Sequence, residues 1–208
     1  MNSNTTAIDN TAVGMNSLFT NTTGTANVAM GRNALQANTT ASNNAAFGYL
    51  ALTTNTTGAD NTAVGHESLT TATTAANNTA IGRASLKLTT TGASNTALGF
   101  ASLFANTTGA NNVAVGSNAL DANTTASNNT AIGKDSLSAN TTGANNVSVG
   151  QGSSGSTTTG GNNTAVGTEA LNNNTTASSN CAFGFEALKD NTTGASNVAV
   201  GKVALANN

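Results

Sequence analysis

A single glycine recurs at every seventeenth residue along the entire chain, and this spacing constrains the fold more than any other feature. No insertion or deletion interrupts the period across the 208 residues. Self-similarity at a short, fixed period is the signature of a protein built by stacking identical units. We therefore expect one repeat domain over residues 1–208, with no second domain. The glycines stand at positions 14, 31, 48, 65, 82, 99, 116, 133, 150, 167, 184 and 201.

Most positions of the repeat hold one type of residue when they are numbered from this glycine as position 0. Position −1 is always large and apolar, position −2 is Ala except at Ser148, and position +4 is Leu except at Ser154. Positions +8 and +9 are always Thr, and position +13 is always Asn. Such constraints favour an ordered stack. The alternative is a disordered, prion-like chain, because only 7% of the residues are charged and Asn, Thr and Gly are abundant.

The length and composition of the repeat predict β-structure. Seventeen residues are too few for two helices and their turns, since helical repeats take about 34 to 47 residues. Proline is absent, and the phrase T-A-V-G alternates with the period of a strand. We predict an all-β fold, a β-solenoid or parallel β-roll of twelve 17-residue coils, with strands at N-T-A-V-G and around x-A-L-x. Coils stacked about 4.8 Å apart would form a rod roughly 55–60 Å long.

Equivalent positions of stacked coils form ladders along such a rod. The large apolar residues at positions −1 and +4 are predicted to fill a thin core. These core residues include Val13, Leu18, Val64, Leu69, Ile81, Leu86, Ile132 and Leu137. The Asn at position +13 is predicted to hydrogen-bond along the rod, as in cross-β Asn ladders. This ladder comprises Asn27, Asn44, Asn61, Asn78, Asn95, Asn112, Asn129, Asn146, Asn163, Asn180 and Asn197.

The two ends of the chain predict a way for copies to assemble. No polar cap is evident, Met1 falls at the position that Leu holds elsewhere, and Asn208 stands seven residues after the last glycine. A second molecule could therefore continue the stack with its ladders in register. Such a head-to-tail contact generates a filament when it does not close, and Met1, Val200 and Leu205 are the predicted contact residues. The alternatives are frayed ends or a piece of a longer protein.

Three short phrases carry a resemblance to known proteins: N-V-A-V-G at 112–116, N-T-A-I-G at 129–133 and N-V-S-V-G at 146–150. They resemble the head repeats of YadA-like trimeric autotransporter adhesins and the N-T-A-I-G repeats of phage tail fibres. The resemblance implies a left-handed parallel β-roll, often trimeric, that serves as a stalk or an adhesive head. The sequence departs from the adhesin pattern in its 17-residue unit and in lacking the neck, the coiled-coil stalk and the membrane anchor.

The composition argues against several classes of function. A net charge of −2 gives no basic surface for nucleic acid, and no apolar run is long enough to span a membrane. The N-terminal segment has no basic region followed by an apolar stretch, so we expect no secretory signal. One His and one Cys cannot form a metal cluster. We therefore expect no enzymatic activity, no catalytic or metal-binding residue and no cofactor. We interpret Cys181 as a small core residue and His66 as a surface residue.

Sequence variation is concentrated at positions +1, +2, +5 and +6, which hold nearly all the charges and most of the aromatic residues. On a solenoid these positions form a variable stripe along the side of the rod. Exposed aromatic side chains favour interfaces, so the stripe is a candidate for contact between rods or with a surface receptor or glycan. A partly buried edge beneath the loops is the alternative. The candidate contact residues are Phe19, Tyr49, Phe100, Phe104 and Phe185.

Three functions fit these features. The first is a self-assembling structural fibre protein that stacks head-to-tail in an extracellular filament or on a virion surface. The second is an adhesive β-roll module whose variable stripe binds a surface ligand. The third is an ice-binding rod, because Thr-Thr ladders on a flat solenoid can order water, although only one Thr of each adjacent pair faces outward. The uncapped ends favour the fibre, whereas the aromatic stripe would favour the adhesive module.

Overall fold

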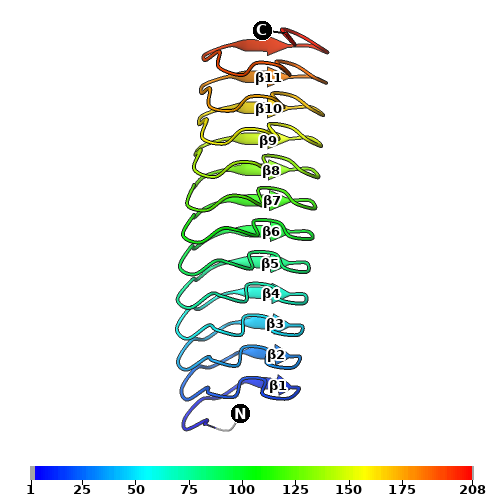
Figure 1. The fold of residues 1–208 in the computed structure, drawn as a ribbon. Coiled ribbons are helices and arrows are strands. Elements are labelled where there is room, and N and C mark those ends of the chain that lie inside the picture. The colour runs from blue at the N-terminus through cyan, green and yellow to red at the C-terminus, as the bar shows by residue number, and fades with distance from the viewer. Residues whose placement is uncertain (1–2, 208) are drawn as a thin grey trace.

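Twelve short parallel strands form one continuous sheet along the side of a rod (Figure 1). The computed structural model describes residues 3–207, and each strand pairs with the strand one repeat later, as Ala12 does with Ala29. The predicted all-β solenoid with a 17-residue coil is thereby confirmed. The strands are β1 (Thr11–Val13), β2 (Val28–Met30), β3 (Ala45–Phe47), β4 (Thr62–Val64), β5 (Thr79–Ile81), β6 (Thr96–Leu98), β7 (Val113–Val115), β8 (Thr130–Ile132), β9 (Val147–Val149), β10 (Thr164–Val166), β11 (Cys181–Phe183) and β12 (Val198–Val200).

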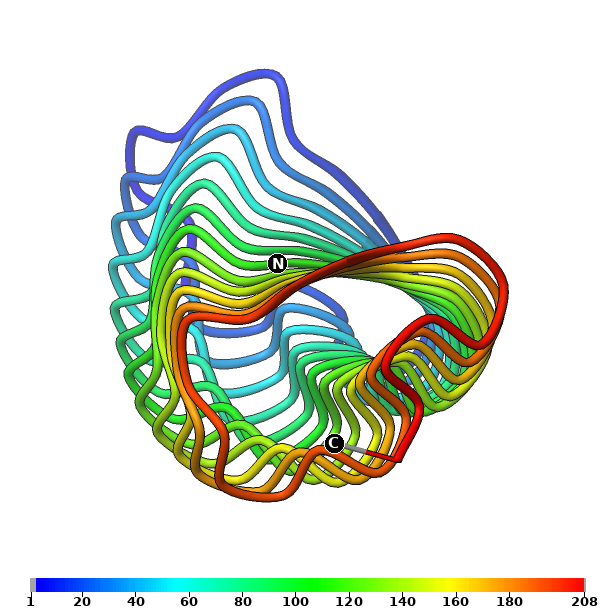
Figure 2. The same ribbon diagram turned by 90° about the horizontal axis from the view of Figure 1, so that it is seen from above.

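The glycine at position 0 makes the corner that follows each strand. Seen along the rod, the coils stack as similar loops that rotate gradually from one end to the other (Figure 2). Gly116 has a φ of +133°, and a β-carbon on it would lie 2.6 Å from the carbonyl oxygen of Gly133 in the next coil. Neither this backbone angle nor this spacing accommodates a side chain. The invariance of the glycine follows from both.

The segment after this corner is a series of turns, so the second strand predicted around x-A-L-x is wrong. Positions +2 and +4 adopt left-handed backbone angles in coil after coil, with a φ of 57° at Asn16 and 48° at Leu18. An extended strand cannot contain such residues. Backbone groups of these turns still form hydrogen bonds between coils. The Leu18 N–H, for example, donates to the Ala34 carbonyl oxygen at 3.0 Å. The coils are therefore joined by hydrogen bonds well beyond their three-residue strands.

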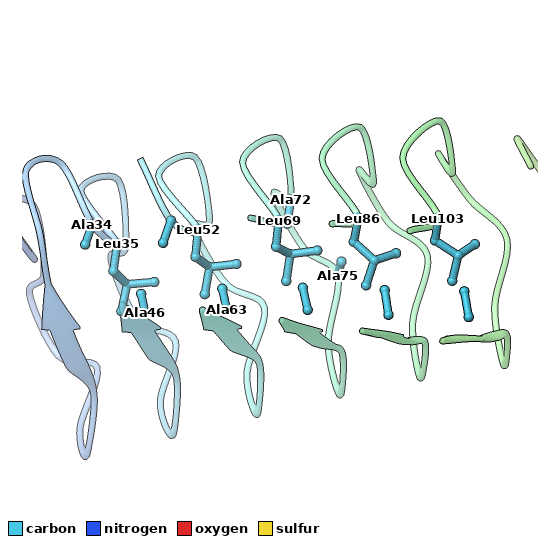
Figure 3. Packing of buried hydrophobic residues seen from close by; sticks show 14 of the residues in the cluster. Ala34, Leu35, Ala46, Leu52, Ala63, Leu69, Ala72, Ala75, Leu86 and Leu103 are labelled. Atoms are coloured by element: carbon cyan, nitrogen blue, oxygen red, sulfur yellow. The ribbon is translucent and has the colours of Figure 1, made fainter. Parts of the chain in front are cut away.

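Leucine and alanine fill the interior of the rod. The Leu at position +4 is fully buried in the interior coils and packs with the Ala at position −2 of the facing strands in apolar clusters, part of one of which is drawn in Figure 3. Burying a leucine side chain contributes about 1.5–3 kcal/mol, so this column is the main apolar contribution of each coil. The predicted core residues that this confirms are Leu18, Leu69, Leu86 and Leu137.

The large apolar residues at position −1 do not belong to this core. Because side chains alternate across a strand, the buried Ala at position −2 turns positions −3 and −1 toward the outside. Val13 is 53% exposed, Ile81 37% and Ile132 40%, and Val64 is half-buried. The prediction that these four residues line the core is wrong, because it assigned them by size and hydrophobicity and not by the alternation of the strand.

One coil interrupts the leucine ladder. Ser154 stands where Leu stands elsewhere and is buried, and it separates an apolar cluster that ends at Leu137 from a second cluster that begins at Ala165. Polar contacts occupy the gap, since Ser148 Oγ donates to the Ser153 carbonyl oxygen at 2.7 Å. The interior of the rod therefore consists of two apolar segments joined by a polar layer.

The Asn ladder at position +13 runs the length of the rod, as predicted, and its interior side chains are buried. Each Oδ1 accepts the backbone N–H of the Asn one coil further on, as Asn95 does from Asn112 at 3.0 Å. The Nδ2 of Asn95 donates to the backbone carbonyl at position +10 of the next coil, 2.9 Å away. The ladder includes the predicted series from Asn27 to Asn197 and begins one coil earlier, with Asn10.

A second buried Asn ladder lies at position +7. Asn38 Nδ2 donates to Asn21 Oδ1 at 2.7 Å and to the Ala41 carbonyl oxygen at 3.0 Å, so it links two coils and closes the N-T-T turn. The recurring Asn of the N-T-T phrase is the sequence signal for this ladder. Unlike position +13, position +7 is not invariant, and the ladder is interrupted at Ala72, Thr89 and Thr157.

The substitution Ala72→Asn is expected to stabilise the rod by about 1 kcal/mol. Asn55 Oδ1 is buried without a hydrogen-bond partner, because Ala72 stands where the next Asn of the ladder would donate. An Asn at position 72 would restore that donor. Urea unfolding followed by circular dichroism measures the change. Ala75→Asn, at a buried position outside the ladder, is the matched control and is expected to destabilise. An unchanged or lower midpoint for Ala72→Asn would contradict the prediction.

Candidate functional site

Three surfaces of the rod are candidates for function: the variable stripe, the outer face of the strands and the C-terminal end. Among residues 3–207 the structure shows no pocket and no group of three or more His, Cys, Asp or Glu side chains placed to hold a metal ion. No helix in that part of the chain is long and apolar enough to cross a membrane. The single histidine, His66, is exposed on the variable stripe, as the sequence predicts.

The variable stripe holds the predicted aromatic contact residues on the outside of the rod. Cations from neighbouring coils lie over several of the rings. The guanidinium carbon of Arg32 is 5.9 Å from the ring centroid of Tyr49, and that of Arg83 is 5.7 Å from the centroid of Phe100. Lys87 over Phe104 and Lys202 over Phe185 repeat the arrangement. Of the predicted residues, Phe19, Tyr49, Phe100 and Phe185 are exposed and Phe104 is half-buried.

Position +1 forms a ladder of planar side chains over five successive coils. Arg32, Tyr49, His66, Arg83 and Phe100 follow one another there. The first two and the last two make the cation–π contacts described above, and the rings of Tyr49 and His66 lie 5.1 Å apart at a tilt of 33°. Each exposed cation–π contact contributes about 0.5–1 kcal/mol. The ladder therefore fixes the orientation of aromatic rings that remain accessible on the surface.

Charged residues of the stripe also pair, both between coils and within one coil. Lys87 Nζ lies 2.8 Å from Glu67 Oε2, and this hydrogen bond holds the pKa of Glu67 below its ordinary value. Lys189 Nζ lies 2.6 Å from Glu169 and 2.8 Å from Glu186, and hydrogen bonds to these two carboxylates raise the pKa of Lys189. Pairs at the surface contribute little to stability. Their effect is to neutralise much of the charge of the stripe locally.

The outer strand face comprises the side chains at positions −3 and −1 of β1–β12. Position −1 holds Val, Met, Phe, Ile or Leu in all twelve strands, and position −3 holds Thr, Val, Ala or Cys. None of the six basic and eight acidic residues of the chain lies at either position. The alternation of T-A-V around a small central residue is the sequence signal for this face. Cys181 lies on the face and is half-buried, so its interpretation as a core residue is wrong.

The adjacent threonines at positions +8 and +9 face different ways, as predicted. Thr39 Oγ1 donates to the Thr56 carbonyl oxygen of the next coil at 3.1 Å, whereas Thr40 is exposed. The same division recurs along the rod, as in Thr107, which donates to the Thr124 carbonyl oxygen at 3.0 Å. This turn therefore presents one column of outward-facing Thr side chains.

The C-terminal end exposes a leucine whose equivalents in the interior coils are buried. Leu205 is 51% exposed, whereas Leu188 one coil earlier has no exposed surface. Val200 is 72% exposed on β12, which has a neighbouring strand on one side only in the described sheet. Met1, the third predicted end contact, lies outside the described residues. The structure thus brings two of the three predicted residues together at one open end.

No family model, no curated protein and no solved structure matches the chain. The resemblance to adhesin heads and tail-fibre repeats therefore rests on the short N-T-A-V-G-type motifs alone. The solenoid fold itself is shown by the strand register along the rod.

Proposed function

We propose that this chain is a structural fibre protein whose copies stack head-to-tail into a filament, outside the cell or on a virion surface. The observation that carries the proposal is the junction between successive coils, which uses the same backbone contacts along the whole described rod.

The uniform junction between coils supports this mode of stacking. Strands pair in one register from β1–β2 to β11–β12. The coil that contains Leu205 covers Leu188, and the Leu188 N–H donates to the Ala204 carbonyl oxygen at 2.9 Å. A coil of a second copy has the same donors and acceptors at the same spacing, so it would cover Leu205 in the same way. Repeated stacking gives an unbranched element of constant pitch, which suits a stalk or fibre.

Electron microscopy of the purified chain at micromolar concentration tests the proposal. Filaments with an axial repeat of roughly 55–60 Å are expected. The variant Leu205→Glu should give short rods, because it places a charge in the junction. Leu88→Glu replaces an exposed leucine on the side of the rod and should leave the filaments intact. Discrete short rods from the unaltered chain would overturn the fibre proposal.

An adhesive module is the second candidate, and the ladder of planar side chains on the variable stripe favours it. Half-exposed aromatic rings held in place by cations are suited to stacking against sugar rings of a surface glycan. Binding of soluble glycans to the unaltered chain and to the double variant Tyr49→Ala, Phe100→Ala tests this function. Binding that disappears in the double variant would support it. Equal glycan binding by both proteins, or no glycan binding by either, would reject the stripe as a binding site.

A further inference from the structure

We propose that the polar layer inside the rod is an opening point, at which the coils on its C-terminal side come away from the stack together while the coils on its N-terminal side stay folded. The polar layer comprises the buried residues Ser148, Ser153, Ser154 and Thr157. Such opening takes place within a single rod and depends neither on end-to-end stacking nor on a ligand of the variable stripe. Three features of one coil carry the proposal: its interior packing, its place in the second Asn ladder and its glycines.

The interior packing changes at the polar layer, whereas the backbone ladder does not. Buried apolar residues form one cluster that ends at Leu137 and a second cluster on the C-terminal side. Ser154 takes the place of the Leu between them, and Ser148 takes the place of the Ala on the facing strand. The strands β8, β9 and β10 keep one register, and the Ser154 N–H donates to the Ala170 carbonyl oxygen at 2.8 Å. The two sides are therefore joined by the usual backbone hydrogen bonds without the usual leucine.

Hydroxyl groups form hydrogen bonds within the polar layer, but these bonds oppose separation less than a buried leucine does. Ser136 Oγ donates to Ser148 Oγ at 2.9 Å, and Ser148 Oγ donates to the Ser153 carbonyl oxygen at 2.7 Å. Water offers the same groups new partners when the coils separate, so the net contribution of these bonds is modest. A leucine that is exposed by separation finds no such replacement.

The second Asn ladder is interrupted at the same coil. Thr157 stands at position +7, and Asn140 Oδ1 in the preceding coil is buried without a hydrogen-bond partner. Where the next coil holds Asn, the equivalent oxygen accepts a bond, as Asn123 Oδ1 does from Asn140 Nδ2 at 3.1 Å. Separation would give the Asn140 oxygen access to water, which favours opening. Polar and apolar contacts are thus both weakened at the junction between residues 133–149 and 150–166.

Glycine also favours the open form of this coil. Gly152, Gly155 and Gly161 stand at positions +2, +5 and +11, which hold a residue with a side chain in every other coil. Glycine loses more conformational freedom on folding than any other residue. Residues 150–166 therefore lose more entropy than other coils when they join the stack.

The C-terminal side is the part that separates, because its core is the smaller one. Within residues 3–207 its apolar cluster contains seven buried residues, and Leu171 and Leu188 are its leucines, whereas the N-terminal cluster contains twenty buried residues. The stability of stacked repeats is approximately a sum of terms for each repeat and for each junction. The few coils beyond a weak junction therefore open at a lower denaturant concentration than the rest of the rod.

Hydrogen exchange of peptic fragments, measured by mass spectrometry in urea below the main unfolding transition, tests the opening. The Leu205→Glu background keeps the rods separate. The fragments that contain Leu171 and Leu188 are expected to exchange at one common rate. This rate should be at least about tenfold faster than that of the fragments that contain Leu103 and Leu120, which corresponds to the loss of one buried leucine. Rates that fall gradually from coil to coil would indicate fraying from the end and would overturn the proposal.

A pair of substitutions shows whether the polar layer is the cause. Ser148→Ala with Ser154→Leu gives this coil the interior residues of the other coils, and it should slow the exchange of the C-terminal fragments at least about tenfold. Ser156→Leu is the matched control. It adds the same side chain to the same coil at position +6, where another coil holds the exposed Leu88, and it should leave the exchange rates unchanged.

A second variant acts on the Asn ladder and leaves the serines in place. Thr157→Asn supplies a donor for the unpaired Asn140 Oδ1, and it should slow the exchange of the C-terminal fragments by about fivefold. Fast exchange that persists both in the serine pair and in Thr157→Asn would show that the rod does not open at the polar layer.

Discussion

Replacing Gly116 by Ala is expected to lower the free energy of unfolding by at least about 3 kcal/mol. Gly116 has a φ of +133°, a region that residues with a side chain rarely enter. The added β-carbon would lie 2.6 Å from both the carbonyl carbon and the carbonyl oxygen of Gly133. This backbone cannot retreat without loss, because the Gly133 N–H donates to the Val115 carbonyl oxygen at 2.8 Å. Urea unfolding followed by far-ultraviolet circular dichroism measures the change.

Gly152→Ala is the matched control for this prediction. Gly152 has a φ of +62°, and the nearest atom to an added β-carbon is the Glu169 Cγ at 3.7 Å. Ala84 and Ala101 already occupy the equivalent position +2 with similar backbone angles. We expect Gly152→Ala to change the stability by less than about 1 kcal/mol, since the loss of freedom in the unfolded chain offsets the strain. Equal destabilisation by the two substitutions would show that the short distance to the glycine backbone of the next coil is not the reason why position 0 is always Gly.

The fold could be predicted from the sequence because its main constraint repeats. Every coil faces another coil of nearly identical sequence, so a residue that fits one junction fits the rest, and the period appears directly in the chain. The left-handed turns could not be predicted in this way. Leu at position +4 adopts a φ near 50°, which is uncommon for a residue with a branched side chain. Its burial stabilises a conformation that its intrinsic preference disfavours, and only the packing shows this.

The candidate surfaces could be predicted in part. The aromatic residues lie on the outside, as their variability suggests, but the pairing between coils depends on which positions become neighbours. Lys87 at position +5 reaches Glu67 at position +2 of the preceding repeat, and no spacing rule for helices or strands gives that contact. The outer strand face was assigned to the core because large apolar residues usually belong there. The small residue at position −2 is the buried residue of each interior strand, so the residues at positions −3 and −1 on either side of it face outward.

Replacing Asn112 by Ala is expected to cost about 3 kcal/mol, making the Asn of position +13 the most sensitive polar residue of the coil. Asn112 Nδ2 donates to Asn95 Oδ1 at 3.1 Å and to the Ala126 carbonyl oxygen at 2.9 Å. Its Oδ1 accepts the backbone N–H of Asn129 at 3.0 Å. Alanine would leave that N–H without a partner in a buried layer, which costs about 1–3 kcal/mol, and would remove both hydrogen bonds that the Asn112 Nδ2 donates. The Ala126 carbonyl oxygen would keep only the bond from the Asn123 Nδ2.

Asn123→Ala, on the second ladder, separates this effect from the loss of any buried amide. Asn123 also makes three side-chain hydrogen bonds, to Asn106, Ala126 and Asn140, but none of them involves a backbone N–H. The chain already tolerates Ala at this repeat position, at Ala72. We therefore expect Asn123→Ala to cost about half as much as Asn112→Ala in urea unfolding. Hydrogen exchange should show faster exchange of the Asn129 amide only in Asn112→Ala. An equal loss of stability in the two variants would contradict this explanation, and so would an Asn129 amide that stays protected in Asn112→Ala. Asn would then be invariant at position +13 for a reason other than the hydrogen bond that its Oδ1 accepts from a backbone N–H.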